Sequence, residues 1–239
     1  MPADAPCRNR LLASLRPADL GRLQRHMEEV KLTPSQVLID AQQPIEHVYF
    51  PHSGVVSLLV IMADGSTIEA GSIGNEGVVG LGGMLAGDVS FSRQVVQLAG
   101  RATRIARTPF LGLADESRPL RARLAKHADT FVAQCLQTAA CNATHALRQR
   151  LARWLLTMAD RSGEDVLPLT QGFLGEILAV RRSSVTLVAR VMQGAGLIDY
   201  SRGVITIRNR AGLRAMACEC YEIIRQTYDE AFAADIERE

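Results

Sequence analysis

The chain has 239 residues, of which 47% are hydrophobic and 22% are charged, and its formal net charge is +2. No apolar run reaches the roughly 18 residues that a membrane-spanning helix needs, so we expect no membrane partner. The first residues are polar and charged and lack the apolar stretch of an export signal, which predicts a cytoplasmic protein. The five cysteines are scattered, which favours free thiols over a disulfide framework.

Apolar residues at helical spacing predict a leading helical segment over residues 8–28. From about Ser35 to Thr108, short apolar runs alternate with glycine and proline, and Asp64-Gly65 is a turn signal between two of them. Several short strands at this spacing indicate a small antiparallel barrel or jelly roll. The glycines of this region form no phosphate-binding loop, since Gly-Lys-(Ser/Thr) does not occur. Gly-x-Ser-x-Gly is also absent, so we do not expect an enzyme.

The next segment, residues 119–145, predicts one long helix. One side of it carries Leu120, Leu124, Phe131, Cys135 and Leu136, with alanines at neighbouring positions. Such a stripe requires a partner helix. A second helix follows over 146–160 and leads into a polar turn at 162–165. The chain is expected to end in one helix, from about Ala211 to Ala234, with a solvated acidic tail.

The most informative stretch lies between residues 169 and 207. Thr170 is placed to cap a first helix, and apolar residues recur at helical spacing through 173–178 and again through 185–192. Gly175 inside the first helix costs about 1 kcal/mol relative to alanine, which indicates close packing of the two helices. Two alternating strands then flank Ser201-Arg202-Gly203, a hairpin signal. This order predicts a helix-turn-helix followed by a wing.

The second of these helices carries hydroxyl donors and guanidinium groups opposite its apolar face, and these groups suit phosphate oxygens and guanine edges. Residues 145–215 hold 11 Arg against 5 acidic residues, so the basic excess coincides with the motif. We expect this helix to enter a DNA major groove. The predicted DNA contacts are Thr170, Gln171, Arg181, Arg182, Ser183, Ser184, Thr186, Arg190 and Arg202.

Two alternatives stay open at this point. Two amphipathic helices and a hairpin can form an ordinary packed unit whose arginines are a solvated face. The chain can also be a signal-binding module whose C-terminal domain contacts another protein. A steep fall of duplex affinity with salt would separate DNA binding from both alternatives.

A small β-roll, a long helix with an apolar seam and a winged helix-turn-helix, in this order, resemble the Crp/Fnr superfamily of bacterial transcription regulators, typified by the cyclic-AMP receptor protein. The most specific segments are 47–56, 149–156 and 169–197. The resemblance implies an α+β fold with a cyclic-nucleotide-binding-type β-roll sensor domain at 1–118, a dimerisation helix at 119–145, and a winged helix-turn-helix domain with a C-terminal helix at 146–239. It also implies a homodimer that binds a two-fold operator on double-stranded DNA, controlled by a signal at the roll, and a contact with RNA polymerase.

The resemblance places an effector site in the roll, where the sequence departs from the family. Cyclic-nucleotide-binding members hold the ribose through a glutamate and the cyclic phosphate through an arginine. The corresponding segment here is 79–85, with Leu81 in place of the glutamate, and Arg93 stands about two positions from the phosphate-binding place. The candidate effector residues are therefore Glu76, Gly80, Leu81, Arg93 and Gln94, with Glu76 as the substitute carboxylate. Control by cyclic AMP is not expected, and an apolar or differently liganded roll is the favoured alternative.

The recognition helix also departs from the family pattern Arg-Glu-x-x-x-Arg. Only the first arginine is retained, as Arg182, while Ser183 and Leu187 stand in place of the glutamate and the second arginine. The resemblance implies that Arg182 contacts guanine and that the operator sequence differs.

The thiols do not predict a metal site. Iron–sulfur members of the superfamily use an amino-terminal cysteine cluster, whereas only Cys7 lies in the first 134 residues. Cys218 and Cys220, on one predicted helix, project about 200° apart, so one ion bound by both would be strained. Cys141 and His145 share a helix face, and two-fold pairing of subunits would bring four such ligands together. Zinc sites usually have more local ligands, so we expect no metal and no certain cofactor.

Overall fold

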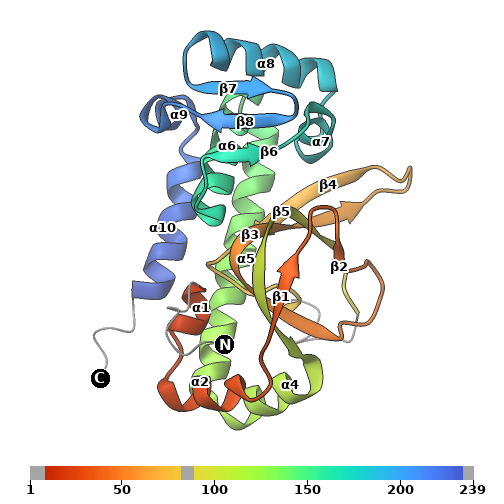
Figure 1. Ribbon diagram of the computed structural model, residues 1–239, viewed down its shortest axis with the longest axis vertical. Helices are drawn as coiled ribbons and strands as arrows, with labels where there is room; N and C mark the ends of the chain where they lie inside the picture. The colour runs from red at the N-terminus through yellow and green to blue at the C-terminus, as the bar shows by residue number, and fades with distance from the viewer. Residues whose placement is uncertain (1–8, 82–88, 234–239) are drawn as a thin grey trace.

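The computed structural model describes residues 9–81 and 89–233, so Cys7 and residues 82–85 of the segment compared above lie outside the described residues. Figure 1 shows an N-terminal sheet beside one long helix, with a smaller domain across the end of both. Within the described ranges no helix combines the length and the apolarity needed to cross a membrane.

The leading helical segment is divided into α1 (Arg10–Ala13) and α2 (Pro17–Gln24). Asn9 caps α1, since its side chain accepts a hydrogen bond from the Leu12 amide at 3.0 Å. Pro17 opens α2, where its missing N–H costs no helical hydrogen bond. The expected helix ends earlier than residue 28, because Glu28 already begins a strand.

Five antiparallel strands form the N-terminal sheet: β1 (Glu28–Leu32), β2 (Val37–Ile39), β3 (His47–Ile61), β4 (Thr67–Ile73) and β5 (Arg93–Ala106). The order is β1-β5-β3-β4, and β2 also pairs with β5. The apolar runs at 47–50 and 55–60 join into β3, whose register shifts around Gly54. Gly54 has φ +79°, and a Cβ there would lie 2.5 Å from the Leu98 carbonyl oxygen, so only glycine fits. The predicted turn at Asp64-Gly65 is confirmed between β3 and β4.

Three helices follow the sheet: α4 (Arg107–Glu116), α5 (Arg118–Thr144) and α6 (Leu147–Ser162). The predicted apolar stripe on α5 does not form one uncovered face, because Leu120 and Leu124 are buried in the core of the sheet domain and Phe131 packs against that core, whereas Leu136 is exposed. A different face of α5 is exposed. It repeats at alternating spacings of three and four residues and comprises Ala122, Ala125, Asp129, Val132, Leu136, Ala139 and Ala143.

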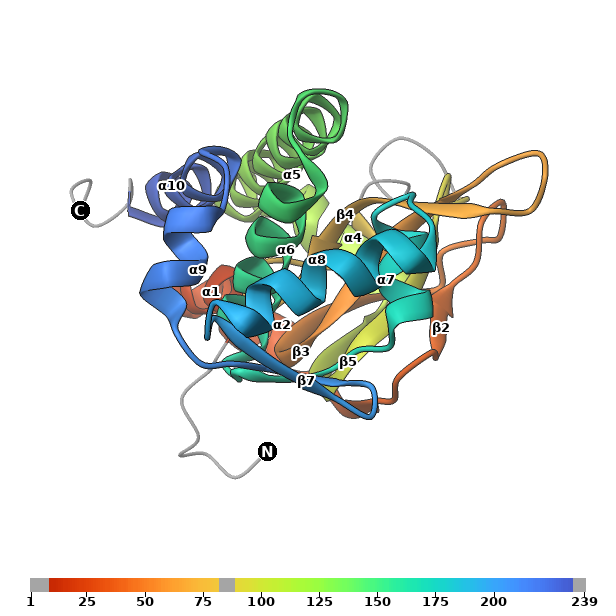
Figure 2. The ribbon, with the colours of Figure 1, turned by 90° about the horizontal axis from the view of Figure 1, so that it is seen from above.

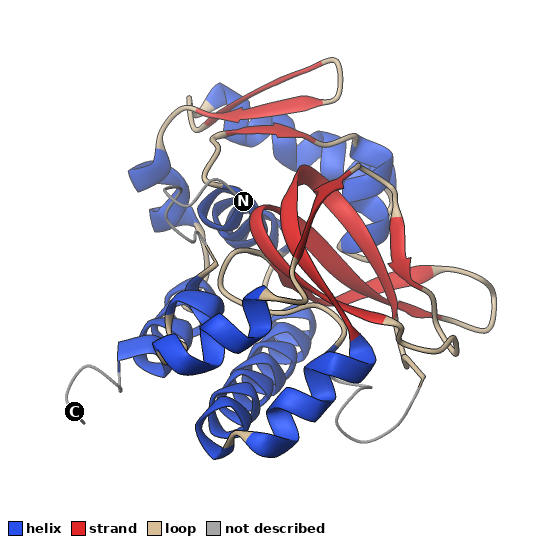
Figure 3. Ribbon diagram, turned by 60° about the horizontal axis from the view of Figure 1, so that its bottom comes forward, coloured by secondary structure: helices blue, strands red, loops and turns tan. Residues whose placement is uncertain are grey.

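The C-terminal part consists of β6 (Val166–Pro168), α7 (Gln171–Ile177), α8 (Arg182–Gly194), β7 (Ile198–Ser201), β8 (Val204–Ile207), α9 (Arg210–Met216) and α10 (Cys220–Ala233). The three strands form a sheet in the order β6-β8-β7. Figure 3 shows this small sheet apart from the larger one, with helices lying beside the larger sheet.

The single C-terminal helix expected from Ala211 to Ala234 is wrong. The chain leaves α9 after Met216, and Ala217 is extended, with φ −66° and ψ 155°. The second piece, α10, then runs back along α5 (Figure 1). Its far end reaches α1, where Arg10 pairs with Asp229 at 3.0 Å and lies over the ring of Phe232.

A network of buried polar groups joins the sheet, α5 and α6. The Trp154 indole N–H donates to a Glu69 carboxyl oxygen at 2.8 Å. Arg161 pairs with Glu76 at 2.8 Å and donates to the Ser72 carbonyl oxygen at 2.6 Å. The larger apolar core likewise combines Val55, Leu59 and Leu98 of the sheet with residues of α6, α7 and α8. The two domains are therefore packed as one body.

Candidate nucleic-acid interface

The connection between α7 and α8 has the local features that the sequence predicts. The Thr170 hydroxyl accepts a hydrogen bond from the Phe173 amide at 3.2 Å and caps α7. A Cβ at Gly175 would lie 2.9 Å from the Val180 carbonyl oxygen, which explains the glycine by close packing. The close neighbour is the backbone of the turn and the start of α8. Ala179 in this turn has φ +52°, the left-handed conformation that favours glycine.

The two faces of α8 differ sharply in burial. Val185, Ala189 and Met192 are buried in the shared core, as the periodicity predicts. The opposite face is uncovered, and Figure 2, seen from above, shows α8 lying over the rest of the molecule. The exposed residues of α8 as a whole are Arg182, Ser183, Leu187, Arg190, Val191, Gln193 and Gly194.

Sequence reasoning did not predict Leu187 and Val191 as site residues. They are 65% and 55% exposed, on the same face as Ser183. Ser183, Leu187 and Val191 follow one another at intervals of four residues, which places them on one helix face, but apolar residues in a helix usually indicate a core.

Six of the nine predicted contact residues fall into two groups, while Thr170 caps α7 and Ser183 and Ser184 lie in the first turn of α8, exposed and half-buried respectively. The Thr186 hydroxyl donates to the Gln171 side-chain oxygen at 2.7 Å, so this pair links α7 to α8 and is only half exposed. The arginines are different: among the described residues, their side chains take part in no hydrogen bond or ion pair. This second group comprises Arg181, Arg182, Arg190 and Arg202. These four guanidinium groups carry positive charge that no acidic side chain of the described residues pairs with.

The predicted wing is formed by β7 and β8. Ser201 pairs with Val204, and the two residues between them, Arg202 and Gly203, have φ +50° and +78°. Two successive positive φ values define a tight turn of type I′, which matches the twist of a hairpin. A Cβ at Gly203 would lie 3.5 Å from the Thr170 methyl group, so the wing tip lies beside the start of α7.

The candidate effector residues are not brought together in one polar site. Glu76 is buried and faces Arg161 of α6. Arg93 forms a bidentate pair with Asp40, with N–O distances of 2.7 and 3.2 Å, and this guanidinium lowers the pKa of the Asp40 carboxyl. Leu81 is only 3% exposed and belongs to the apolar core of the sheet domain.

The remaining two candidates have structural surroundings of their own. Gly80 has φ +93° and lies against the His47 carbonyl oxygen, which a Cβ would approach to 3.0 Å. The Gln94 side chain is buried and donates to the Ser90 hydroxyl at 3.1 Å. Apolar side chains fill the core beside them, among them Val48, Phe50, Val56, Ile73, Val79, Val96 and Ile105.

The expectation that Cys218 and Cys220 project apart from one helix is wrong. Cys218 lies in the connection between α9 and α10, and Cys220 is the first residue of α10. Both sulfurs lie near Cys141 and His145 at the end of α5, within one subunit.

Both parts of the chain match models of known protein families. Residues 29–117 match the cyclic nucleotide-binding domain, and residues 149–216 match the Crp-like helix-turn-helix domain. Comparison with curated protein sequences finds no match.

Solved structures show the same fold at low sequence identity. FixK2 from Bradyrhizobium japonicum superimposes with a TM-score of 0.68 at 16% identity, over 80% of this chain and 98% of that one. A Crp/Fnr-family transcriptional regulator from Eubacterium rectale gives 0.67 at 17% identity, over 86% and 96%. The c-di-GMP-responsive global regulator CLP of Xanthomonas campestris gives 0.65 at 14% identity, over 80% and 99%.

The order of the two matched domains, the long helix between them and the shared fold identify the family. The chain belongs to the Crp/Fnr superfamily of transcription regulators.

Proposed function

We propose that the chain is a homodimeric transcription regulator that binds a two-fold DNA operator, with α8 in the major groove and the wing against the backbone. The observation that carries this proposal is the uncovered face of α8 with its unpaired arginines. Because the proposed partner is chromosomal DNA, we expect this regulator in the cytoplasm. A contact with RNA polymerase rests on the family resemblance alone.

The individual roles follow from the chemistry of the exposed groups. Arg182 at the first turn of α8 is placed for a bidentate contact to guanine O6 and N7. Leu187 and Val191 offer apolar surface suited to the methyl group of thymine. Arg202 at the wing tip is suited to a phosphate, which positions the domain without selecting a sequence.

The second subunit would pair along the exposed face of α5. Its three-four spacing is that of a coiled-coil seam, and its alanines allow two helices to approach closely. Val132 and Leu136 are 55% and 67% exposed and would supply the apolar centre of this seam. Leu136→Glu should therefore give a monomer in analytical ultracentrifugation, whereas Ile223→Glu, at an exposed apolar site on α10, should remain dimeric.

The signal at the roll is proposed to differ from cyclic AMP. The buried leucine at position 81 offers no acceptor for a ribose hydroxyl, and Glu76 and Arg93 already have charged partners. Calorimetric titration with cyclic AMP should show no binding. The same titration with c-di-GMP tests the signal to which the Xanthomonas regulator responds.

The DNA-binding proposal is tested by selecting operators from a random duplex library and measuring affinity for the selected and a scrambled duplex over a range of salt. Arg182→Ala should lose about 1 to 3 kcal/mol of discrimination between the two duplexes. Arg202→Ala should weaken both alike and reduce the salt slope. Arg101→Ala, on the roll and paired with Glu29, is the matched control. Duplex binding that does not depend on salt would contradict the proposal and favour the module that contacts protein.

A further inference from the structure

Four side chains with metal-ligating atoms converge where α5 ends and α10 begins. Cys141 lies in the last turn of α5, and His145 is the residue directly after that helix. Cys218 and Cys220 come from the connection into α10, more than seventy residues later in the sequence. One ligand atom from each of the four lies within 4.8 Å of the others.

Two of the six ligand separations are close to those of a tetrahedral zinc centre, and the others do not exceed 4.8 Å. The Cys141 and Cys218 sulfurs are 3.5 Å apart, and the Cys220 sulfur is 3.6 Å from Nδ1 of His145. With Zn–S bonds of about 2.3 Å and Zn–N bonds of about 2.0 Å, a tetrahedron has S–S edges of about 3.8 Å and S–N edges of about 3.5 Å. A single ion at the centre therefore needs only small shifts of these side chains.

The groups around the cluster are those that orient metal ligands. Nε2 of His145 lies 3.2 Å from a Glu219 carboxylate oxygen, which leaves Nδ1 for the ion. The Gln137 side-chain amide donates to the Cys220 sulfur at 3.1 Å. Three thiolates and one Zn²⁺ carry a net negative charge, and Arg150 interacts electrostatically with Cys141 and Cys218.

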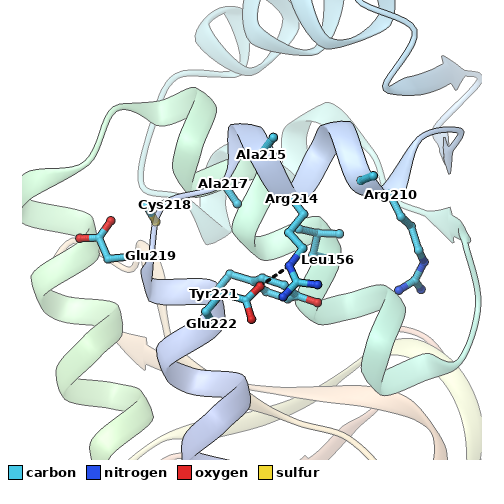
Figure 4. A pocket seen from close by; sticks show the side chains of 10 residues that line it. Leu156, Arg210, Arg214, Ala215, Ala217, Cys218, Glu219, Tyr221 and Glu222 are labelled. Carbon is cyan, nitrogen blue, oxygen red and sulfur yellow. Dashed lines mark hydrogen bonds and ion pairs between the residues drawn. The ribbon is translucent and has the colours of Figure 1, made fainter.

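The four ligand groups are largely shielded from solvent, but a groove leads to one of them. Cys141 and Cys220 are fully buried, and Cys218 is 4% exposed. Cys218 also lines an open groove of about 640 Å³ between α9 and α10. Figure 4 shows Cys218 and Glu219 at this junction, with Glu219 extending from the start of α10 towards α5. An ion can approach the cluster at Cys218 from this groove.

We propose that Cys141, His145, Cys218 and Cys220 of one subunit bind a single Zn²⁺ ion. A disulfide between Cys141 and Cys218 would involve only two of the four groups. It would not explain why His145 lies between Glu219 and Cys220. The ion fixes the connection between α5 and α6 to the α9–α10 connection, because His145 and Ala146 are the only residues between α5 and α6.

The test begins with the full chain purified under a thiol reductant without chelator. Elemental analysis should find one zinc per chain, and exchange for Co²⁺ should give the intense visible ligand-field bands of tetrahedral thiolate cobalt. Cys218→Ser and His145→Ala should abolish the stoichiometric ion. Cys135→Ser, on α5 but outside the cluster, should retain it.

The Glu219→Gln variant keeps the proposal testable even if ligand variants fold poorly. Glu219 is exposed and lies outside the ligand set, so the fold should persist. Zn²⁺ affinity, measured by competition with a chromophoric chelator, should fall about 10- to 100-fold. An unchanged affinity overturns the assigned role of His145.

Three outcomes overturn the site itself. These are absence of stoichiometric zinc after reconstitution, equal binding by Cys218→Ser and the parent, and a Cys141–Cys218 disulfide in the reduced, anaerobically handled protein. With zinc bound, amide exchange of peptides covering 145–147 and 217–220 should slow. Any effect of the ion on operator affinity rests on the proposed function, whereas metal content and exchange do not depend on DNA binding.

Discussion

The buried pair of Arg161 and Glu76 permits a quantitative test of how the two domains are held together. Their side chains are only 7% and 6% exposed, and the ion pair is 2.8 Å long. Arg161 also donates to the Ser72 carbonyl oxygen and to the Gln134 side-chain oxygen, so one guanidinium contacts the sheet and α5 from its place on α6. Replacing Arg161 by methionine keeps much of the volume and removes every one of these donors.

The expected cost follows from burial. Removal of one partner of a buried ion pair leaves an uncompensated charge and costs about 3 to 5 kcal/mol. In Arg161→Met, the one hydrogen-bond donor left to Glu76 among the described residues is the Gly74 amide, 3.1 Å from both carboxylate oxygens. Glu76→Gln should destabilise for the converse reason. The double variant buries no unpaired charge. Its loss of stability should therefore be smaller than the sum of the two single losses by at least about 2 kcal/mol.

Urea unfolding measures these free energies. Trp154 is the sole tryptophan and donates to Glu69 in the same interface, so its fluorescence reports on the separation of the domains. The exposed pair of Arg208 and Asp199 is the control, and a cycle on it should give a coupling below about 1 kcal/mol. Additivity of Arg161→Met and Glu76→Gln within about 0.5 kcal/mol would refute the reasoning.

Three further predictions concern single sites. Ala179→Gly should stabilise the protein by about 0.5 to 1 kcal/mol. Glycine removes the strain of a left-handed residue at φ +52°, and the greater conformational entropy of glycine in the unfolded chain offsets part of that gain. A lower melting temperature of the variant would contradict this. Burial lowers the pKa of His127 to about 4, below its usual 6.5. The folded state holds His127 neutral, so the free energy of unfolding is highest above pH 6.5 and falls by about 3 kcal/mol as the pH falls towards 4. Denaturant unfolding of His127→Gln should lack that part of the pH profile. Burial raises the pKa of Glu69, so its contribution is present below about pH 4.5 and declines as the pH rises through the folded-state pKa. Circular dichroism should show that decline in the parent and a flatter profile in Glu69→Gln.

The helix-turn-helix could be predicted because its signals are local. The Thr170 cap, the close approach at Gly175 and the turn at Gly203 each depend on residues a few positions away. The short strands were harder to predict. β1 has the sequence Glu-Glu-Val-Lys-Leu, and β6 ends in proline, so neither has the alternating apolar pattern of a half-buried strand.

Long-range pairing could not be predicted from the sequence. Glu76 and Arg161 are 85 positions apart, and no pattern around either residue indicates its partner. The break between α9 and α10 falls at Ala217 and contains neither glycine nor proline, so the sequence does not indicate it. The positions of Cys218 and Cys220 beside Cys141 depend on this break and could not be predicted either. The face of α5 was misassigned for a related reason, because leucines buried against the sheet and residues open to solvent share the same helical period.

The return of α10 along α5 means that the chain ties the C-terminal domain to the rest of the protein at two places, in addition to the apolar core that the domain shares with the sheet. One is the short connection from α5 to α6, and the other is the strut formed by α10, which is tied to Arg10 at its far end. A domain held at several places is confined to small tilts that every attachment tolerates. Truncating the strut should therefore widen the range of orientations that the domain samples in solution.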